Sequence, residues 1–563
     1  MRNTPSLTPI HEVQGPDVRS PFAGKTVRIR GVVTGHTRKG YFVQDPDGSP
    51  DPRASAAIFV YSPRRKARVG MSVEVVGNVI DFRRHERGRP TTQLKVLETR
   101  KLQKDGPTIE PVWLTPDRLP ADPVELATVL NGLEGMLVGI VADSTFVAAS
   151  NPYGDYVCVP PGIDALRATN GGVVVDPASP SRWLPGFRIV KYRDAPKVNV
   201  GATLRSPVVG PLNYRAESFQ VVARGGIEFD DAPVTQTRTS FDDAPDRITV
   251  LTVNGFNLDA HVEDPRAVSD PDRDVDDDKL YGRFELLADA IVGQAGSPDV
   301  IALQEIQDND GAEITEVVDA TATYEQLAND IRWRGGPDYH WADIPPDVGA
   351  DGGQPGGNIR NAFLYNPARV ELVEASLRRL GTSDVAYEGS RKPLLACFRV
   401  RASGAELVVV NVHLASKRHQ NSIFAPDQPG YDPREPTRVR QAEIVREALS
   451  DLRARGGDFY VTGDFNDFEF SATLRALTGD DCVNMVETLP PEDRYDYNHR
   501  GQLQVLMHGV VPKRAHDAGA VEYQILHGNE LAGVKPGSTY AKASDHAYVI
   551  ARIRVGDGLA RGA

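Results

Sequence analysis

Short alternations of apolar and polar residues fill the first hundred residues of the chain. Five stretches alternate at a period of two and are separated by Gly, Pro and Asp: KTVRIRGVVTG, GYFVQD, AAIFVYS, SVEVVGNVI and TTQLKVLE. Such alternation predicts β-strands. Five short strands at this spacing predict a small barrel, and we place this first domain at residues 1–104.

A second β-rich segment follows at residues 105–235. Its strand candidates are LEGMLVGIVADSTFVAA, GDYVCVP, WLPGFRIV, GATLRSPVVGPLNY and FQVVA, interrupted by a stretch rich in Pro and Gly. No catalytic constellation is visible in the sequence of this segment, so we interpret it as a scaffold. A polar, proline-containing linker at residues 236–247 follows it.

Strands and helices alternate from residue 248 to residue 556. Apolar residues at three- and four-residue spacing predict helices in GRFELLADAIVGQ, YEQLANDIRW and VRQAEIVREALSDLRAR. This order predicts an α+β fold, a two-sheet α/β sandwich with its helices outside. A short tail at residues 557–563 would end the chain.

Polar side chains stand at the ends of the predicted strands of this region. The motifs are Asn254 in TVNGFNL, Glu305 in VIALQEI, His413 in VVVNVHL, Asp464 and Asn466 in GDFND, and Asp545 and His546 in SDH. One such residue is common in any α/β protein. The whole set supplies carboxylates, carboxamides and imidazoles but no serine or thiol nucleophile. It therefore predicts attack by water on a phosphodiester, assisted by a hard divalent cation.

The composition is that of a globular protein of two or three domains. Of the 563 residues 40% are apolar, and no run of 18 apolar residues predicts a membrane span. The first residues, MRNTPSLTPIHEVQGPD, lack the apolar core of a signal peptide. Cys158, Cys397 and Cys482 lie far apart without metal-ligand spacing, so neither a disulfide scaffold nor a zinc site is expected.

Charge is divided unevenly along the chain. The first 100 residues have 18 Lys and Arg against 9 Asp and Glu, a net charge of +9, so the remainder carries −22 of a total of −13. Basic residues concentrate in two turns, at residues 61–70 and 81–90. Cations on hairpin tips are placed to meet phosphates, which favours nucleic acid as the partner; a solvated surface is the alternative. The candidate contacts are Arg64, Arg65, Lys66, Arg83 and Arg84.

The second half of the chain resembles the endonuclease/exonuclease/phosphatase superfamily, and within it a bacterial, often extracellular, nuclease branch. The segments that carry the resemblance include ALQEIQDNDG, VDATATYEQL, DGGQPGGNIRNAFLYNPARV, SRKPL, GDFNDFEFS and LPPEDRYDYNHRGQLQVL. In the first domain, GYFVQDPDG resembles the OB-fold module that precedes the catalytic domain in that branch. The resemblance implies a metal-dependent nuclease that acts on DNA, with RNA as a second substrate class.

The resemblance also implies roles for individual residues. Glu305, Asn254 and Asp545 are the implied ligands of Mg²⁺, with Mn²⁺ or Ca²⁺ as alternatives. Asp464 and Asn466 would position the attacking water, and His413 would donate a hydrogen bond to the phosphoryl oxygen. His546 would act as general base or orient the phosphate. The implied substrate-binding residues are Asn257, Arg360, Arg391, Lys417 and His508.

Met507 departs from the family pattern. The resembled nucleases usually have a Leu-Asp-His phrase whose aspartate orients the histidine of SDH, whereas this chain reads VLMHGVV. A thioether accepts no strong hydrogen bond from an imidazole. The change predicts a slow enzyme, a rewired one, or an inactive relative that still binds nucleic acid. Asp496, in RYDYNH, is near enough in sequence to be a replacement partner.

Other possibilities stay open at this point. A phosphodiesterase or phosphatase for a lipid or small molecule would have the same fold, although the basic first domain speaks against it. No membrane partner is expected. The missing signal peptide favours the cytoplasm, whereas the resemblance favours export. Oligomeric state and the choice between endo- and exonucleolytic action leave no trace in the sequence.

Overall fold

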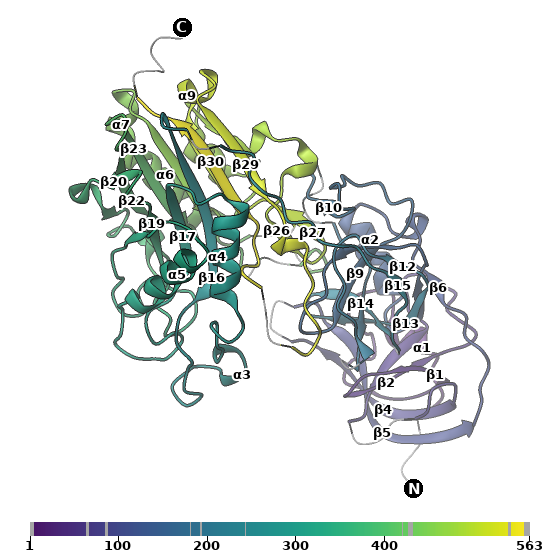
Figure 1. Cartoon of the computed structure of the whole chain (residues 1–563). Helices are drawn as coiled ribbons and strands as arrows, with labels where there is room; N and C mark the ends of the chain where they lie inside the picture. The colour runs from purple at the N-terminus through teal and green to yellow at the C-terminus, as the bar shows by residue number, and fades with distance from the viewer. Residues whose placement is uncertain are drawn as a thin grey trace.

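The computed structural model describes most of the chain. The described residues are 5–63, 67–84, 88–178, 180, 182–191, 194–223, 225–242, 244–418, 420, 422–425, 432–538 and 542–556. The predicted tail and three candidate nucleic-acid contacts, Arg64, Arg65 and Lys66, lie outside them. Three parts follow one another along the chain (Figure 1): a barrel (residues 26–103), a middle unit (residues 112–230) and a two-sheet domain (residues 247–554).

The barrel is closed by five strands in the order β1-β2-β3-β5-β4. Their bounds are β1 Thr26–His36, β2 Gly40–Gln44, β3 Ala57–Tyr61, β4 Ser72–Phe82 and β5 Thr91–Gln103. Side chains alternate across a strand, so Val27 and Ile29 of β1 meet Val73 and Val75 of β4 in one core. A short helix, α1 (Ile10–Gln14), packs on the same core. The five predicted strands and the barrel are both present.

Part of the barrel's positive charge is balanced within the barrel. Glu74 accepts a hydrogen bond from Arg30 at 2.8 Å and lies 3.2 Å from Arg100. Just after β4, Arg84 is exposed and Arg83 is half-buried. Contact of these two residues with nucleic acid stays a prediction.

The middle unit is built on a nine-stranded sheet in the order β15-β12-β8-β9-β11-β14-β13-β7-β6. The bounds are β6 Val112–Trp113, β7 Leu137–Ile140, β8 Thr145–Ala148, β9 Asp155–Val159, β11 Gly186–Ile189, β12 Thr203–Leu204, β13 Val208–Arg215, β14 Ser218–Ala223 and β15 Phe229–Asp230. Helix α2 (Pro123–Gly132) begins after Asp122, whose side chain accepts hydrogen bonds from the N–H groups of Val124 and Glu125. Aromatic rings fill the core of the middle unit, with the ring of Tyr156 stacked on that of Phe187 at 4.9 Å.

The two-sheet domain has the predicted sandwich. One sheet runs β18-β19-β17-β16-β30-β29, and the other runs β20-β22-β23-β24-β28-β25 with β21 beside β22. The first sheet comprises β16 Arg247–Leu258, β17 Val300–Ile306, β18 His340–Ala342, β19 Arg360–Tyr365, β29 Val521–Leu526 and β30 Tyr548–Arg554. The second comprises β20 Val370–Leu372, β21 Arg378–Arg379, β22 Leu394–Val400, β23 Glu406–His413, β24 Phe459–Asp464, β25 Cys482–Asn484 and β28 Met507–Pro512.

Helices cover the outer faces of both sheets, and the three predicted helical stretches are all present. The helices of the two-sheet domain are α3 Pro271–Asp274, α4 Arg283–Asp289 continued by a π-turn at Ala290–Gln294, α5 Thr321–Trp333, α6 Glu435–Ala448, α7 Ser450–Ala454, α8 Ala472–Thr478 and α9 Lys513–Asp517. Within the described part of the chain, no helix combines the length and the apolar composition needed to span a bilayer.

Alternation along each strand sets the layers of the sandwich. In β17, Val300 and Ala302 belong to the core between the two sheets, whereas Ile301 and Leu303 belong to the core beneath α4 and α5. A strand of the first sheet is therefore apolar on both faces, as expected when one face packs on a sheet and the other on helices.

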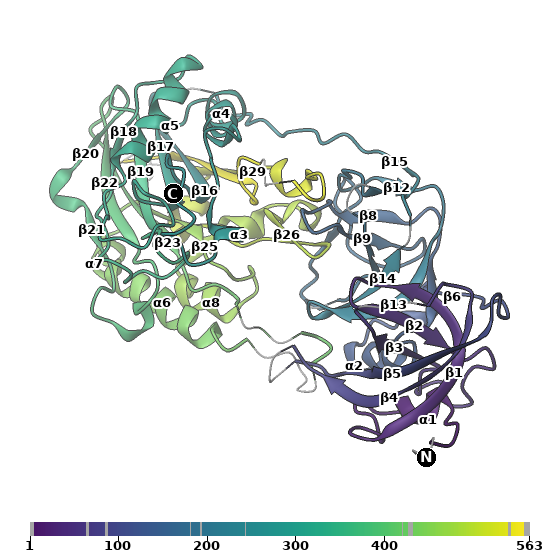
Figure 2. The same ribbon diagram turned by 90° about the horizontal axis from the view of Figure 1, so that it is seen from below.

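A third, small sheet joins the middle unit to the two-sheet domain. Strands β26 (Tyr497–His499) and β27 (Gln502–Gln504) form a hairpin, and β10 (Val173–Val174) of the middle unit pairs with β27 in parallel. In Figure 2 the hairpin lies between the middle unit and the two-sheet domain, while the linker runs along the top of the picture, away from the hairpin. The linker is fastened to the two-sheet domain, since Thr237 N–H donates to the carbonyl of His527 at 2.9 Å.

Candidate active site

Three polar side chains occupy the last inward-facing positions of strands β16, β23 and β24. In β16, Val250 and Thr252 precede Asn254 at two-residue steps, and in β24 Thr462 precedes Asp464 in the same way. The hydroxyl groups of Thr252 and Thr462 meet across the two sheets at 2.6 Å. One step further on, Asn254 Nδ2 lies 3.4 Å from Asp464 Oδ2. The period of the strands therefore brings these two residues together at the sheet ends.

Buried amides join the sheets directly beneath this point. Gln304 Nε2 donates to Asn411 Oδ1 at 2.6 Å, and Asn411 Nδ2 donates to the carbonyl oxygens of Leu303 and Ala362. Both amide side chains are fully buried. The sequence prediction missed this support, although inward Gln and Asn residues at two-residue spacing in apolar strands were a readable signal.

Asp464 is the centre of the site. Its Oδ1 accepts the N–H of Asn466 at 2.8 Å, while its Oδ2 lies 3.5 Å from His413 Nε2 and 3.9 Å from His546 Nε2. Burial raises the pKa of Asp464 to about 6, against the lowering effect of the nearby His546. The group is therefore a carboxylate at neutral pH, with a basicity closer to that needed for accepting a proton from water.

Glu305 reaches the site through an unusual backbone conformation. Its φ of +55° lies in the left-handed region, immediately after inward-facing Gln304. Phe256, Asn257 and Asn466 also have positive φ, so strained backbone gathers around the site. Glu305 Oε1 lies 3.7 Å from His413 Nε2. Burial raises the pKa of Glu305 to about 7, and the charge of Asp545 adds to the effect.

His413 is a neutral imidazole. Burial lowers its pKa well below the usual value, and the positive charges of Arg391 and His546 lower it further. Its Nδ1 has no hydrogen-bond partner among the described residues. A neutral ring with one N–H can donate a hydrogen bond without carrying charge into the site.

His546 carries a partner that compensates for the departure at position 507. Its Nδ1 lies 2.5 Å from Oδ2 of Asp496, a fully buried carboxylate. Burial alone would lower the pKa of His546, but Asp545 and Asp496 outweigh it and raise the pKa to about 10. The other oxygen of Asp496 accepts the N–H groups of Leu506 at 2.5 Å and Met507 at 3.0 Å. The imidazole is thus fixed in orientation and holds its proton.

Met507 takes part only through its backbone. It pairs opposite Asp464 in the second sheet, and its side chain is fully buried in the core between the sheets. The aspartate that this position lacks is replaced in space by Asp496, which arrives on the hairpin of β26 and β27. The sequence offered Asp496 as a possible replacement partner, and the fold brings it there because the hairpin turns back onto His546.

The strand-end oxygens suit a hard divalent cation. Burial raises the pKa of Glu305, and the negative charges of Asp545 and Asp464 raise it further. A bound cation would offset this concentration of negative charge, and Mg²⁺ needs only one or two carboxylates because it keeps several waters. Asn254 is less available as a ligand, since its Oδ1 already accepts the N–H of Phe256 at 2.8 Å.

Arg391 lies near Glu305 and Asp464, and Lys417 lies four residues after the end of β23. Arg391 is buried, donates to the carbonyl of Leu414 at 3.0 Å, and leaves its Nε without a partner among the described residues. Lys417 Nζ lies 3.2 Å from Asp467 and 3.4 Å from Asp432, above the ring of Phe468. Each can still offer positive charge to a phosphate. Asn257 is half-buried near the end of β16, where its φ is positive.

Two other predicted substrate contacts are placed differently. Arg360 is 2% exposed and spends its donors on the carbonyl oxygens of Asn358 and Val318. His508 is fully buried, with its ring nitrogens at 3.1 Å from Asn484 Nδ2 and 2.9 Å from the carbonyl of Asp467. Neither side chain has a free group to offer a substrate. The predicted substrate contacts of Arg360 and His508 therefore do not fit the structure, and both residues support the fold.

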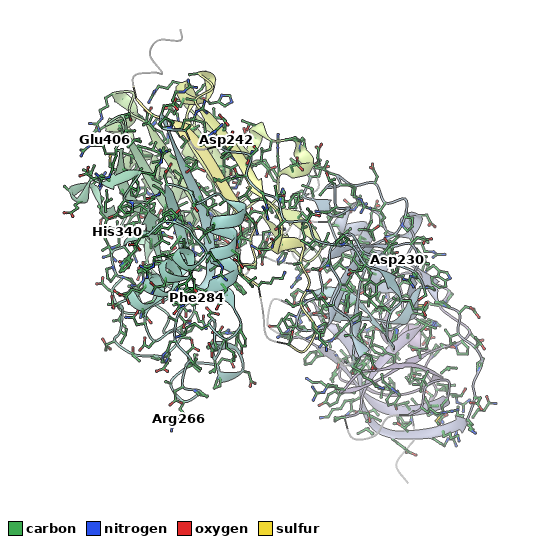
Figure 3. The ribbon with its side chains drawn as sticks, in the orientation of Figure 1. Asp230, Asp242, Arg266, Phe284, His340 and Glu406 are labelled. Atoms are coloured by element: carbon green, nitrogen blue, oxygen red, sulfur yellow. The ribbon has the colours of Figure 1, made fainter. Side chains whose placement is uncertain are left out.

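A second group of acids lies beyond β16. Asp259, Glu263 and Asp276 bring their oxygens within 4.8 Å of one another, and among the described residues no other three His, Cys, Asp or Glu side chains do so. Burial raises the pKa of Asp276 to about 7, and the charges of Asp278 and Glu263 add to this. The acidic residues and prolines of DPRAVSDPDRDVDDDK (residues 264–279) indicate an exposed, solvated loop. That holds for Arg266 at its tip (Figure 3) but is wrong for its fully buried aspartates, Asp274 and Asp278.

Comparison with known proteins assigns the region around the site. A family model described as Endonuclease/Exonuclease/phosphatase family matches residues 235–546, more than half of the chain. A second model, described as a domain of unknown function, matches residues 127–231 of the middle unit. No curated protein matches.

Solved structures of low sequence identity match slightly more than half of the chain. An endonuclease/exonuclease/phosphatase from Bacteroides vulgatus is 14% identical with a TM-score of 0.34, over 55% of this chain and 99% of that one. A humanised D. rerio TDP2 is 16% identical with a TM-score of 0.35, over 55% and 98%. The human Nocturnin catalytic domain is 14% identical with a TM-score of 0.35, over 57% and 97%.

Proposed function

Because the chain belongs to the endonuclease/exonuclease/phosphatase family, we propose that it is a divalent-metal-dependent nuclease that hydrolyses phosphodiester bonds of DNA. The observation that carries the proposal is the convergence on Asp464. An acid with a raised pKa stands among two imidazoles and an amide, and His546 is held by its own buried carboxylate. Together these groups can transfer a proton and bind a phosphate at one point.

The roles follow from the geometry. Asp464 accepts the proton of the attacking water, and Asn254 together with the Asn466 backbone holds the carboxylate in place. The water oxygen bonds to phosphorus, the bond to one ester oxygen breaks, and that oxygen takes up a proton from a solvent water. His413 donates Nε2–H to a phosphoryl oxygen as negative charge builds up. His546, paired with Asp496, presents its Nε2–H to the same phosphate, so it orients the phosphate rather than acting as general base.

Metal binding is assigned to Glu305 and Asp545, with Asn254 next to them. A bound Mg²⁺ or Mn²⁺ would neutralise charge on the scissile phosphate. Arg391 and Lys417 would hold neighbouring phosphates, since Arg391 lies near Glu305 and Asp464 and Lys417 carries positive charge on the segment that follows His413.

The barrel favours a polymeric substrate. Its closed five-stranded order supports an OB-fold, a module that binds single-stranded nucleic acid through a basic groove. We assign Arg83 and Arg84 as contacts to the phosphate backbone. An inactive relative is disfavoured, because Asp496 supplies the contact that Met507 cannot.

A panel of substrates tests this assignment. The purified protein is incubated with labelled single-stranded DNA, duplex DNA, RNA, bis-p-nitrophenyl phosphate and p-nitrophenyl phosphate, in EDTA, Mg²⁺ or Mn²⁺. We expect metal-dependent cleavage of the DNA strands and the diester and none of the monoester. Cleavage of the monoester alone would assign a phosphatase, and salt-dependent DNA binding without cleavage in either metal would assign a binding protein.

A further inference from the structure

The segment that carries Asp496 is hydrogen-bonded to the segment that carries His546. Asp496 stands directly before β26, and its carbonyl accepts the N–H of Ala547 at 2.7 Å. The next residue, Tyr497, forms an isolated antiparallel bridge with His546, and the two rings lie 4.7 Å apart. The contact between carboxylate and imidazole therefore depends on where the hairpin of β26 and β27 lies.

That hairpin is fastened to the middle unit by polar contacts. Val175 N–H donates to the carbonyl of Leu503 at 2.8 Å, which extends the pairing of β10 with β27. Asn498 Nδ2 donates to the carbonyl of Val147 at 2.9 Å. On the other side of Asp496, Asn170 Nδ2 donates to the hydroxyl of Tyr495 at 3.0 Å. Residues on both sides of Asp496 are thus bonded to the middle unit.

Close packing also holds the hairpin of β26 and β27 against the middle unit. Leu503 is fully buried in a cluster with Val174 and Val200 of the middle unit. At the hairpin turn Gly501 has a φ of +89°, and a Cβ there would come within 2.9 Å of Val147 and Val157. A two-stranded hairpin of three-residue strands is marginal by itself in water, so the middle unit supplies most of what orders it.

The middle unit also holds the chain that leads to His546. Val534 N–H donates to the carbonyl of Ser150 at 2.9 Å, and the Ser150 hydroxyl donates back to the carbonyl of Val534 at 2.7 Å. Val200 N–H donates to the carbonyl of Leu531 at 3.0 Å. Both segments that bring Asp496 and His546 together are therefore bonded to the middle unit.

We propose that the middle unit is a working part of the active site, in which Asn170 and Asn498 are positioning residues that hold Asp496 against His546. The proposal rests on the nuclease function proposed above and gives residues 105–235 a role beyond that of a scaffold. The reason is geometric: the carboxylate meets the imidazole at 2.5 Å, and a displacement of about 1 Å can cost about 100-fold in rate.

Kinetics of single and double variants of the full chain test the proposal. Asn170→Ala and Asn498→Ala together should lower kcat for DNA cleavage by about 10- to 100-fold with little change in KM, because orientation rather than substrate binding is lost. In an Asp496→Asn background the same two changes should cost nothing further. The matched control is Ser422→Ala, which removes a 2.9 Å bond to Glu217 at another contact with the middle unit and should leave kcat unchanged.

The NMR signal of the His546 N–H proton distinguishes failure of the positioning role from failure of the proposed nuclease function. The short contact between His546 and Asp496 should give a downfield imidazole N–H signal that Asp496→Asn abolishes and the Asn170→Ala, Asn498→Ala variant weakens. A parent without nuclease activity whose signal behaves in this way would refute the nuclease and leave the positioning role intact. An active, folded double variant with parental kcat and signal would overturn the positioning role, and so would an equal loss of kcat in the Asp496→Asn background. Should the double variant unfold, the two single variants carry the same comparison.

Discussion

Two groups of buried acids, one around Asp464 at the strand ends and one in the loop after β16, differ in what surrounds them. Asp464 accepts the N–H of Asn466 at 2.8 Å, and the side chains of Asn254, His413 and His546, from three separate elements, lie 3.4 to 3.9 Å from it. Around Asp259, Glu263 and Asp276 the hydrogen-bond donors among the described residues are backbone N–H groups, such as Ala312 N–H to Glu263 at 3.2 Å. Both groups contain an acid whose pKa is raised by burial.

The comparison teaches that buried acids do not mark an active site by themselves. The loop group is the tighter cluster of carboxylates, yet among the described residues no imidazole pairs with its acids in the way His413 and His546 face Asp464. Proton transfer and phosphate binding need basic and hydrogen-bond-donating side chains around one point. The strand-end group has such side chains, whereas the described surroundings of the loop group supply backbone donors.

The largest expected effect is on Asp464. Asp464→Asn keeps the size and the hydrogen bond to Asn466 but removes the basic oxygen, so cleavage in Mg²⁺ should fall by about 10³- to 10⁴-fold. Asp276→Asn is the matched variant from the loop group and should cleave at the parental rate. Initial rates on labelled DNA measure both. Equal losses in the two variants would remove the distinction between the groups.

The next largest effect is expected for Asp496→Asn. The amide oxygen can still accept from the N–H groups of Leu506 and Met507, but the carboxylate facing His546 is lost. We expect kcat to fall by about 10²- to 10³-fold, below the roughly 10⁴-fold cost of the comparable aspartate in the serine-protease triad. The pH profile of kcat supplies a second measurement: without Asp496 the pKa of His546 falls, so the alkaline limb should move to lower pH. An unchanged profile would mean that the pair does not contribute to the rate.

Met507→Asp should affect stability more than activity. The side chain is fully buried beside Asp464, so a carboxylate there is desolvated and close to like charge. We expect a loss of about 3 kcal/mol in the free energy of unfolding, with kcat per folded molecule near the parental value. Urea unfolding and active-site titration distinguish the two. A rise of tenfold or more in kcat would show that Asp496 is an incomplete replacement.

The smallest effect concerns the loop group and pH. The folded-state pKa of Asp276, about 7, lies above the unfolded value of about 4, so its protonated form favours folding. That contribution is fully present below about pH 4 and is lost as pH rises through 7. In EDTA, Asp276→Asn should therefore melt about 2 °C or more above the parent at pH 8, and the difference should shrink as pH falls and vanish below about pH 4. A constant difference across this range would contradict the assignment.

The sequence predicted the strands, the three helical stretches and most residues of the site, because period-two and period-3.6 patterns are local. Asn254, His413 and Asp464 were readable as the ends of apolar strands. Asp496 could not be placed in the same way, since its partner is 50 residues away and the hairpin that delivers it is ordered by the middle unit.

The incorrect predictions share a cause. His508 and Arg360 carry the right chemistry for a phosphate contact, but burial and hydrogen bonding decide whether a side chain is free, and neither is visible in a motif. Likewise, the prolines and charges of residues 264–279 indicated an exposed loop. Only the tertiary structure shows that Arg283 folds Asp278 inward by pairing with it.

The most direct test of the account is the cleavage of one labelled DNA strand by parent and Asp464→Asn proteins, each in Mg²⁺ and in EDTA. The account predicts cutting by the parent in Mg²⁺ only, and none above background by the variant. Cutting by the variant at the parental rate would contradict the assignment of the strand-end group as the active site.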